Sequence, residues 1–167
     1  MYDRLLKHIE TNNILAVKQF GFRTSSTEKA SYKLNDNILN VLNNGMMVGG
    51  IFCDTQKAFD CVNHNILLTK LEFYGITGII YKLLKSYLKG RYQRVVLNNY
   101  SSSSYSNWGE ITHGVLQGSI LGPLLFLLYI NYLPQITNDN SKIDLFADDT
   151  SMIISNPNPL NFEKKCK

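Results

Sequence analysis

The sequence predicts an α+β fold, a mixed or antiparallel sheet with helices packed on one face. Apolar residues recur at helical spacing in five segments, short β-branched or alternating runs lie between them, and some of these runs pair as hairpins. With 167 residues, of which 44% are hydrophobic, the chain is long enough for one domain with a buried core.

The first half of the chain alternates helix and strand. A helix is predicted at 5–13, and a second begins at a serine cap, Ser25 or Ser26, and ends at Gly45. The apolar run 46–52 then predicts a strand.

That strand delivers Asp54 at its end. Asn63 or Asn65 caps the next helix, which ends near Gly75, and a further helix covers 78–89.

A hairpin and a long apolar helix follow. The hairpin pairs 92–97 with 105–111, across a serine-rich loop. Ser119 caps a helix over 120–133, which Pro134 stops. The longest apolar run of the sequence lies within this helix and is well short of the ~20 residues of a membrane span.

The segment 142–154 predicts a strand, a tight turn and a second strand, with Asp148 and Asp149 at the tip. Adjacent aspartates before a threonine are also ordinary turn chemistry. Two carboxylates in a half-buried tip repel each other, and a divalent cation removes that penalty. If the strand that ends at Asp54 lies beside the hairpin, a third carboxylate joins the pair.

Charge and cysteine content restrict the functional class only weakly. A net charge of +4 and a pI of about 8.9 are compatible with a polyanionic partner without requiring one. The three cysteines form no CxxC pair, and no secretory signal is visible, so we expect reduced thiols and an intracellular protein, in the nucleus or the cytoplasm.

Four blocks together resemble the reverse transcriptase of non-LTR (LINE-type) retrotransposons. In chain order they are QFGFRTSSTEKA at 19–30, IFCDTQKAFDCVNHNILLTKLEFYGITG at 51–78, GVLQGSILGPLLFLLYINYLP at 114–134 and LFADDTSMI at 145–153. The resemblance implies a right-hand polymerase fold, in which 1–155 form a partial domain, mostly palm with part of the fingers. The segment 156–167 is expected to be an exposed or frayed tail.

The resemblance also implies the active site. Asp54, Asp148 and Asp149 are the catalytic acids that bind two Mg²⁺ ions, with Mn²⁺ as an alternative, and the backbone carbonyl of Thr55 is a further metal ligand. Carboxylate and carbonyl oxygens are the hard ligands that Mg²⁺ prefers. The implied reaction is transfer of a nucleotide from a dNTP to a primer 3′-hydroxyl.

The same resemblance implies a nucleotide site. Phe59 lies beneath the sugar and disfavours a 2′-hydroxyl, Ala58 lines the same pocket, and Gln117 and Gly118 approach base and sugar. Phe146 lies near the primer end. A plain core role for Phe59 is the alternative.

Six basic residues are candidates for contacts with an RNA template or DNA primer: Arg23, Lys82, Lys85, Lys89, Arg91 and Arg94. For Arg23, a structural role in a turn is predicted equally well as a contact with nucleic acid. A solvated helix face is the alternative for the lysine cluster.

Two residues differ from the usual motif, Leu116 for proline and Tyr132 for aspartate. We also expect the finger segments, thumb and endonuclease regions of a larger element protein to lie outside this chain. A truncated remnant that folds or binds nucleic acid without polymerising therefore stays open, as does a template-independent or RNA-copying polymerase.

Overall fold

The structure is a computed structural model and describes residues 1–23, 27–99, 102–136, 141–158 and 162. In chain order its elements are α1 (Tyr2–Thr11), α2 (Thr27–Asn43), β1 (Met47–Cys53), α3 (His64–Phe73), α4 (Gly78–Leu88), β2 (Tyr92–Gln93), β3 (Val96–Asn98), β4 (Ser103–Tyr105), β5 (Gly109–Glu110), α5 (Leu121–Ile130), the 3₁₀ turn η1 (Leu133–Gln135), β6 (Ser141–Phe146) and β7 (Asp149–Asn156). The predicted serine cap of α2 lies outside the described residues.

A three-stranded antiparallel sheet has β7 at its centre, between β1 and β6. The strands form because their residues alternate or are β-branched. In β6, Ile143 and Leu145 are buried, whereas the intervening Asp144 is half-buried. In β7, both Ile153 and Ile154 are buried, as befits a central strand.

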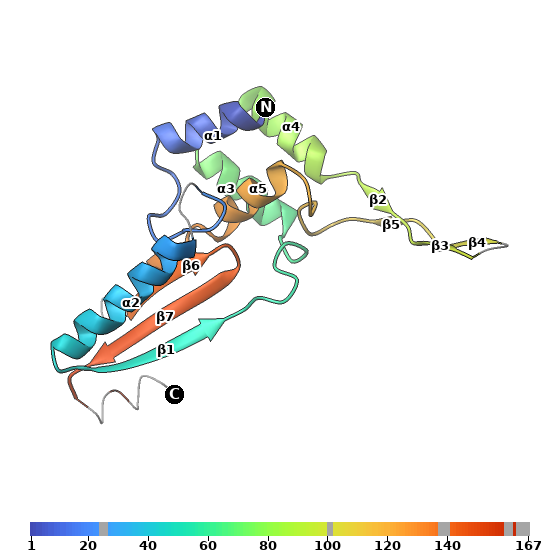
Figure 1. Cartoon of the computed structure of the whole chain (residues 1–167). Coiled ribbons are helices and arrows are strands. Elements are labelled where there is room, and N and C mark those ends of the chain that lie inside the picture. Colours follow the sequence, from blue (N-terminus) through green and yellow to red (C-terminus); the bar gives the residue numbers. More distant parts are fainter. Residues whose placement is uncertain (24–26, 100–101, 137–140, 159–161, 163–167) are drawn as a thin grey trace.

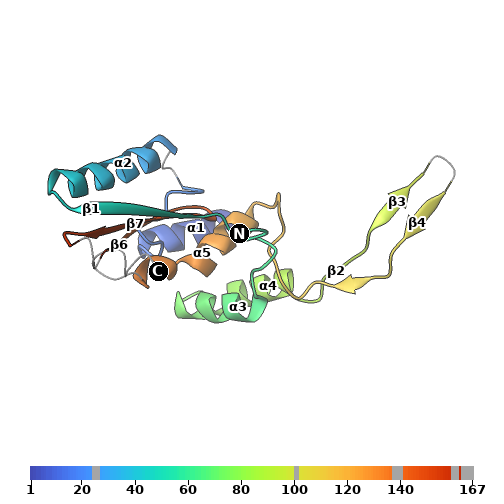
Figure 2. The ribbon, with the colours of Figure 1, turned by 90° about the horizontal axis from the view of Figure 1, so that it is seen from below.

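Helices lie on both sides of this sheet. α2 packs against all three strands on one side, and Figure 2 shows α1 and α5 on the opposite side. The predicted α+β class and antiparallel sheet are confirmed. The prediction placed all helices on one face of the sheet, whereas α2 lies on the face opposite to α1 and α5. The side of α2 that faces the sheet includes the buried residues Asn37 and Val41.

The main core lies among α1, α3, α4 and α5. Its fully buried side chains include Leu67, Leu71, Leu84, Leu88, Leu125 and Leu128. α5 is apolar on all sides, and six of its residues are buried, so this helix forms the centre of the helical layer. It begins at Leu121, one residue after the predicted start, and the hydroxyl of Ser119 accepts a hydrogen bond from the Gly122 amide.

Several element ends follow local chemistry. The Asn63 side chain caps α3 by accepting hydrogen bonds from the amides of Asn65 and Ile66. Gly45 and Gly75 follow α2 and α3 with positive φ, as predicted.

Other ends differ from the prediction. α5 ends at Ile130, before the predicted 133, and Pro134 lies within η1. The predicted hairpin exists as two short pairs, β2 with β5 and β3 with β4, and projects from the body of the molecule (Figure 1). β7 extends to Asn156, and beyond it the half-buried Phe162 ring lies over Gly49 of β1.

Within the described residues, no helix is both long and apolar enough to cross a membrane.

Truncating Leu125 to alanine should lower the free energy of unfolding by about 2–5 kcal/mol, because the side chain is fully buried in the helical core. Leu39→Ala is the matched control. It removes the same atoms from a side chain that is 57% exposed and should change stability by no more than about 0.5 kcal/mol. Equal losses in urea denaturation would contradict the described core.

Candidate functional site

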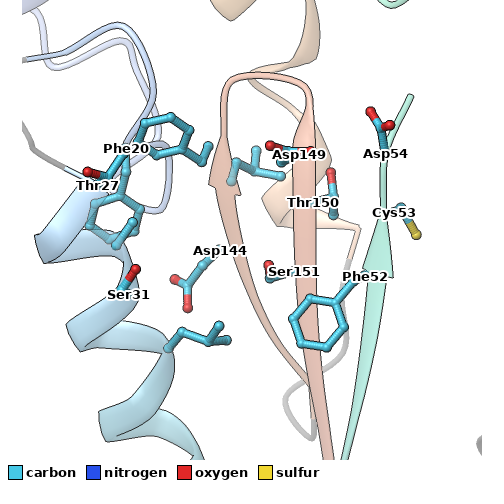
Figure 3. Close-up of a pocket in the computed structure, with 14 residues that line it drawn as sticks. Phe20, Thr27, Ser31, Phe52, Cys53, Asp54, Asp144, Asp149, Thr150 and Ser151 are labelled. Atoms are coloured by element: carbon cyan, nitrogen blue, oxygen red, sulfur yellow. The ribbon is translucent and has the colours of Figure 1, made fainter. Parts of the chain in front are cut away.

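The β1–β7 pairing brings two distant acidic segments to one end of the sheet. The last residue of β1, Cys53, pairs with Thr150, so Asp54 follows β1 beside Asp149 at the start of β7. Figure 3 shows both aspartates at this end of the sheet. The predicted proximity of the Asp54 segment and the hairpin is thus present.

The hairpin turn consists of Ala147 and Asp148, because Phe146 and Asp149 form the last pair of the β6–β7 ladder. The prediction that both aspartates lie at the tip is wrong by one residue. Ala147 has φ +57°, the left-handed conformation that two-residue hairpins require and that alanine rarely adopts.

A buried glutamine, which sequence reasoning did not single out, contacts this turn. Gln19 is 3% exposed; its side-chain oxygen accepts hydrogen bonds from the amides of Gly21 (2.8 Å) and Ala147 (3.0 Å). Its side-chain amide lies 3.4 Å from the Ala147 carbonyl. In the sequence, the only sign of a role for Gln19 was its position at the start of the QFGFR block. The burial of its side chain depends on tertiary contacts, which local sequence patterns do not reveal.

Two cavities adjoin the acidic end of the sheet. One, of about 430 Å³, lies between α2 and the sheet, and its lining includes Asp54, Asp144, Phe146 and Asp149. The alternation of side chains along paired strands puts Phe146 and Asp149 on the same face, toward α2. Figure 3 shows Asp144 directed into the space between β6 and α2.

The second cavity, of about 610 Å³, gathers all four predicted nucleotide-binding residues together with one acidic residue. Its lining includes Ala58, Phe59, Gln117, Gly118 and Asp148. These residues come from three segments far apart in the sequence. Their common cavity is the strongest geometric link between the two predicted sites.

Phe59 lies in a series of three aromatic rings. Its ring stacks on Phe126 of α5 at 4.5 Å between centroids and contacts Phe22 edge-on at 5.9 Å. Phe59 is only half-buried, so it both packs on the core and lines the second cavity.

One side-chain hydrogen bond and one glycine with positive φ define the loop before α5. The Gln117 side chain donates a hydrogen bond to the Asp60 carboxylate at 3.2 Å. Gly118 has φ +76°, and a Cβ there would meet no atom within 4 Å. Gly118 thus has a backbone conformation that glycine adopts readily and other residues rarely do, and its predicted approach to a nucleotide stays a prediction.

The acidic side chains have the chemistry of a Mg²⁺ site. Across the described residues, no side chain hydrogen-bonds or ion-pairs with the carboxylates of Asp54, Asp148 or Asp149. The described part of the chain contains no group of three acidic, histidine or cysteine side chains already arranged to hold a metal ion. The Thr55 carbonyl accepts a hydrogen bond from Ala58 at 3.2 Å. Unpaired carboxylates at one sheet end fit a hard divalent cation.

A fourth carboxylate lies deeper in the cavity under α2. Burial raises the pKa of Asp144 above its ordinary value, and a hydrogen bond from Asn37 (2.9 Å) and the charges of Lys18, Lys33 and Lys142 oppose this shift.

The basic residues divide into structural and exposed ones. The Arg23 guanidinium donates to the carbonyls of Ala16 (3.1 Å) and Gln19 (3.4 Å), which is the structural alternative predicted for it. Lys82 and Lys85 are exposed on α4.

Lys89, Arg91 and Arg94 lie near or in the projecting hairpin. Lys89 donates to Asn65 at 2.8 Å. One guanidinium nitrogen of Arg91 is buried without a hydrogen-bond partner among the described residues, and the guanidinium lies 5.7 Å from the centre of the Tyr87 ring. Arg94 lies over the rings of Tyr105 and Trp108, at 4.5 and 4.7 Å. A nucleic-acid contact for any of these stays a prediction.

A family profile described as "Reverse transcriptase (RNA-dependent DNA polymerase)" matches residues 1–165. The chain belongs to the reverse transcriptase family. The sequence-based assignment is thereby confirmed.

This reverse transcriptase chain is similar to polymerases of Drosophila mobile elements. It is 33% identical over 150 residues to the probable RNA-directed DNA polymerase from transposon X-element of Drosophila melanogaster, covering 87% of the chain and 16% of the relative. To the jockey polymerase of the same species it is 30% identical, covering 90% of the chain and 17% of the relative. The chain thus spans about a sixth of these relatives' length, and its kinship with non-LTR retrotransposon polymerases is confirmed.

Solved telomerase structures share the fold. The telomerase of Candida albicans, in complex with a fragment of telomeric RNA, superposes with a TM-score of 0.64 over 96% of this chain and 30% of that one, at 12% identity. The apo telomerase of Candida tropicalis gives the same TM-score over 99% of the chain, at 13% identity.

Replacing Asp144 by asparagine should stabilise the protein at pH 7 and have little effect near pH 3. Because its pKa is raised in the folded state, folding binds a proton between the ordinary aspartate value, ~3.9, and the raised one. The stability that the bound proton contributes is present at low pH and is lost as the pH rises through the raised pKa of Asp144. Above that pH the buried carboxylate is charged, and asparagine at this position avoids the cost of burying that charge.

Urea denaturation at both pH values measures the effect. Asp36→Asn is the matched control for charge, because Asp36 forms an exposed ion pair with Lys33 at 3.5 Å. Equal stability of Asp144→Asn and the parent protein at pH 7 would contradict the raised pKa.

Proposed function

We propose that this chain forms the palm active site of an RNA-directed DNA polymerase, which transfers nucleotides from dNTPs to the 3′-hydroxyl of a DNA primer on an RNA template. The observation that carries the proposal is the second cavity. It unites Asp148 with Phe59, Ala58, Gln117 and Gly118, the four residues for which the family resemblance implies nucleotide binding.

In this proposal Asp54, Asp148 and Asp149 hold two Mg²⁺ ions, or Mn²⁺, with the carbonyl of Thr55. The bound ions would activate the primer hydroxyl and neutralise charge that develops on the phosphates. The unpaired state of the three carboxylates among the described residues supports this role, since carboxylate oxygens without a protein partner can bind a divalent cation. The chain's own part is to carry these oxygens on two paired strands and one tight turn.

The stacked Phe59 ring forms a rigid wall of the nucleotide cavity. Because it packs on Phe126 and Phe22, it cannot move aside without losing aromatic contacts. A 2′-hydroxyl that meets this wall is excluded by steric clash, so the cavity favours dNTP over NTP. Gln117, held by Asp60, is poised on another wall for polar contact with the nucleotide.

The primer and template are assigned to the remaining predicted residues. Phe146 lines the cavity beside Asp149 and is proposed to lie near the primer end. Exposed Lys82, Lys85 and Arg94 offer cations for phosphates. We infer that the chain works inside the cell as part of a longer element protein, which supplies fingers, thumb and endonuclease regions.

Asp148→Asn should abolish Mg²⁺-dependent primer extension, with a loss of at least about 100-fold, because it removes a charged metal ligand. The assay uses an RNA template, a DNA primer and dNTPs, with this chain replacing the matching segment of the jockey polymerase. Asp36→Asn, an equal charge change at an exposed site outside the two cavities, should retain full activity.

Full extension by Asp148→Asn would refute the assignment. Salt-dependent RNA binding with no extension by the unmodified chain would favour the alternative, a remnant that binds nucleic acid without polymerising.

Phe59→Val should raise the ratio of ribonucleotide to deoxyribonucleotide incorporation by about tenfold or more, because it shortens the wall beneath the sugar. The ratio is measured in competition, so a general loss of activity cancels. Phe73→Val, the same substitution on a side chain that is 86% exposed, should leave the ratio unchanged. An unchanged sugar preference in Phe59→Val would leave Phe59 as a core residue only.

A further inference from the structure

The segment that precedes Arg23 forms a short extension of the main sheet. The Phe20 amide donates to the Leu145 carbonyl at 2.8 Å, and the Leu145 amide donates to the Lys18 carbonyl at 2.9 Å. Gln19 and Leu145 are thereby bridged in parallel, so Gln19 lies against the last part of β6, directly before the turn.

The Gln19 side chain reaches from this ladder to the turn itself. Its oxygen accepts from both Gly21 and Ala147, and its nitrogen faces the Ala147 carbonyl. One buried amide thus contacts both backbone polar groups of the residue before Asp148. The packing is tight, because a Cβ on Gly21 would lie 2.1 Å from the Ala147 nitrogen.

Ala147 needs such support for a physical reason. A non-glycine residue at φ +57° is disfavoured by local sterics, and Ala147 is only 7% exposed, so water cannot satisfy its backbone groups freely. The conformation of Ala147 fixes the direction in which Asp148 leaves the turn. Any relaxation of Ala147 therefore moves the Asp148 carboxylate.

We infer that Gln19 is a positioning residue of the metal site, which holds the Ala147–Asp148 turn in the conformation that presents Asp148. The inference rests on the proposed function, since it assumes that Asp148 binds a divalent cation. Gln19 touches neither metal nor nucleotide and acts through the backbone of Ala147. Partners that orient metal ligands typically change affinity by about 10–100-fold when removed.

The test compares Gln19→Met with Asn131→Leu in the full chain. Methionine matches glutamine in length and removes all hydrogen bonds to the turn. Asn131 is a matched buried amide, 7% exposed, that holds the same segment upstream through Ala16 (2.7 Å) and Ile14 (2.8 Å) without contacting the turn. Mn²⁺ affinity, measured by the loss of the free-ion EPR signal, and amide hydrogen exchange at Ala147 are followed in each variant.

Gln19→Met should weaken Mn²⁺ binding by about tenfold or more. Exchange at the Ala147 amide should speed up by about fivefold, the effect of one lost hydrogen bond. Asn131→Leu should change neither the Mn²⁺ affinity nor the exchange rate at Ala147. This should hold even if Asn131→Leu lowers the thermal unfolding midpoint as much as Gln19→Met does. In the jockey polymerase whose matching segment is replaced by this chain, Gln19→Met should lower kcat for primer extension with little change in the KM for dNTP.

Three outcomes would overturn the inference. Unchanged exchange at Ala147 would show that the hydrogen bonds do not hold the turn. Faster exchange with unchanged Mn²⁺ affinity would remove the link to the metal, and equal effects of both variants would reduce Gln19 to a structural residue. If the unmodified chain binds no Mn²⁺, the proposed function itself is contradicted. This outcome is seen in the unmodified chain alone, before any variant is compared.

Discussion

The antiparallel pairing of β1 with β7 is the constraint on which the rest of the site depends. Seven consecutive residue pairs fix its register, and a slip of one residue would turn every side chain of β1 to the other face. In the observed register Asp54 follows β1 on the same side as Asp149, toward α2. The two acidic segments meet because buried isoleucines of β7 hold the central strand in place.

The β1–β7 pairing brings together acidic side chains that no basic residue among the described ones pairs with. Three carboxylates without a partner among the described residues lie at one sheet end. The Asp144 carboxyl lies in the cavity under α2, where burial raises its pKa because it disfavours the charged form. The backbone ladder and the tightly packed Gly21–Ala147 contact hold the segments together nonetheless. Functional sites commonly retain such locally unfavourable features, which the surrounding structure stabilises.

How far the sequence predicts this fold depends on whether the controlling interaction is local. The asparagine cap of α3 and the glycines after α2 and α3 were predictable, because capping chemistry lies within a few residues. The turn was misplaced by one residue because Ala147 adopts positive φ with the help of Gln19, 128 residues away. The face of the sheet on which α2 packs could not be predicted either, because its contacts with β1, β6 and β7 are tertiary and leave no local sequence pattern.

The one-residue shift of the turn makes the adjacent aspartates inequivalent. Asp148 lies in the turn and lines the cavity of Phe59 and Gln117, whereas Asp149 begins β7 and lines the cavity under α2. Strand alternation enforces this difference, since Asp149 is paired with Phe146 and shares its face. A hairpin with both acids in the turn would lack that constraint. In the proposed metal site, the two neighbouring carboxylates would therefore serve opposite sides, one toward the cavity of Phe59 and one toward the cavity under α2, because Ala147 occupies the first turn position.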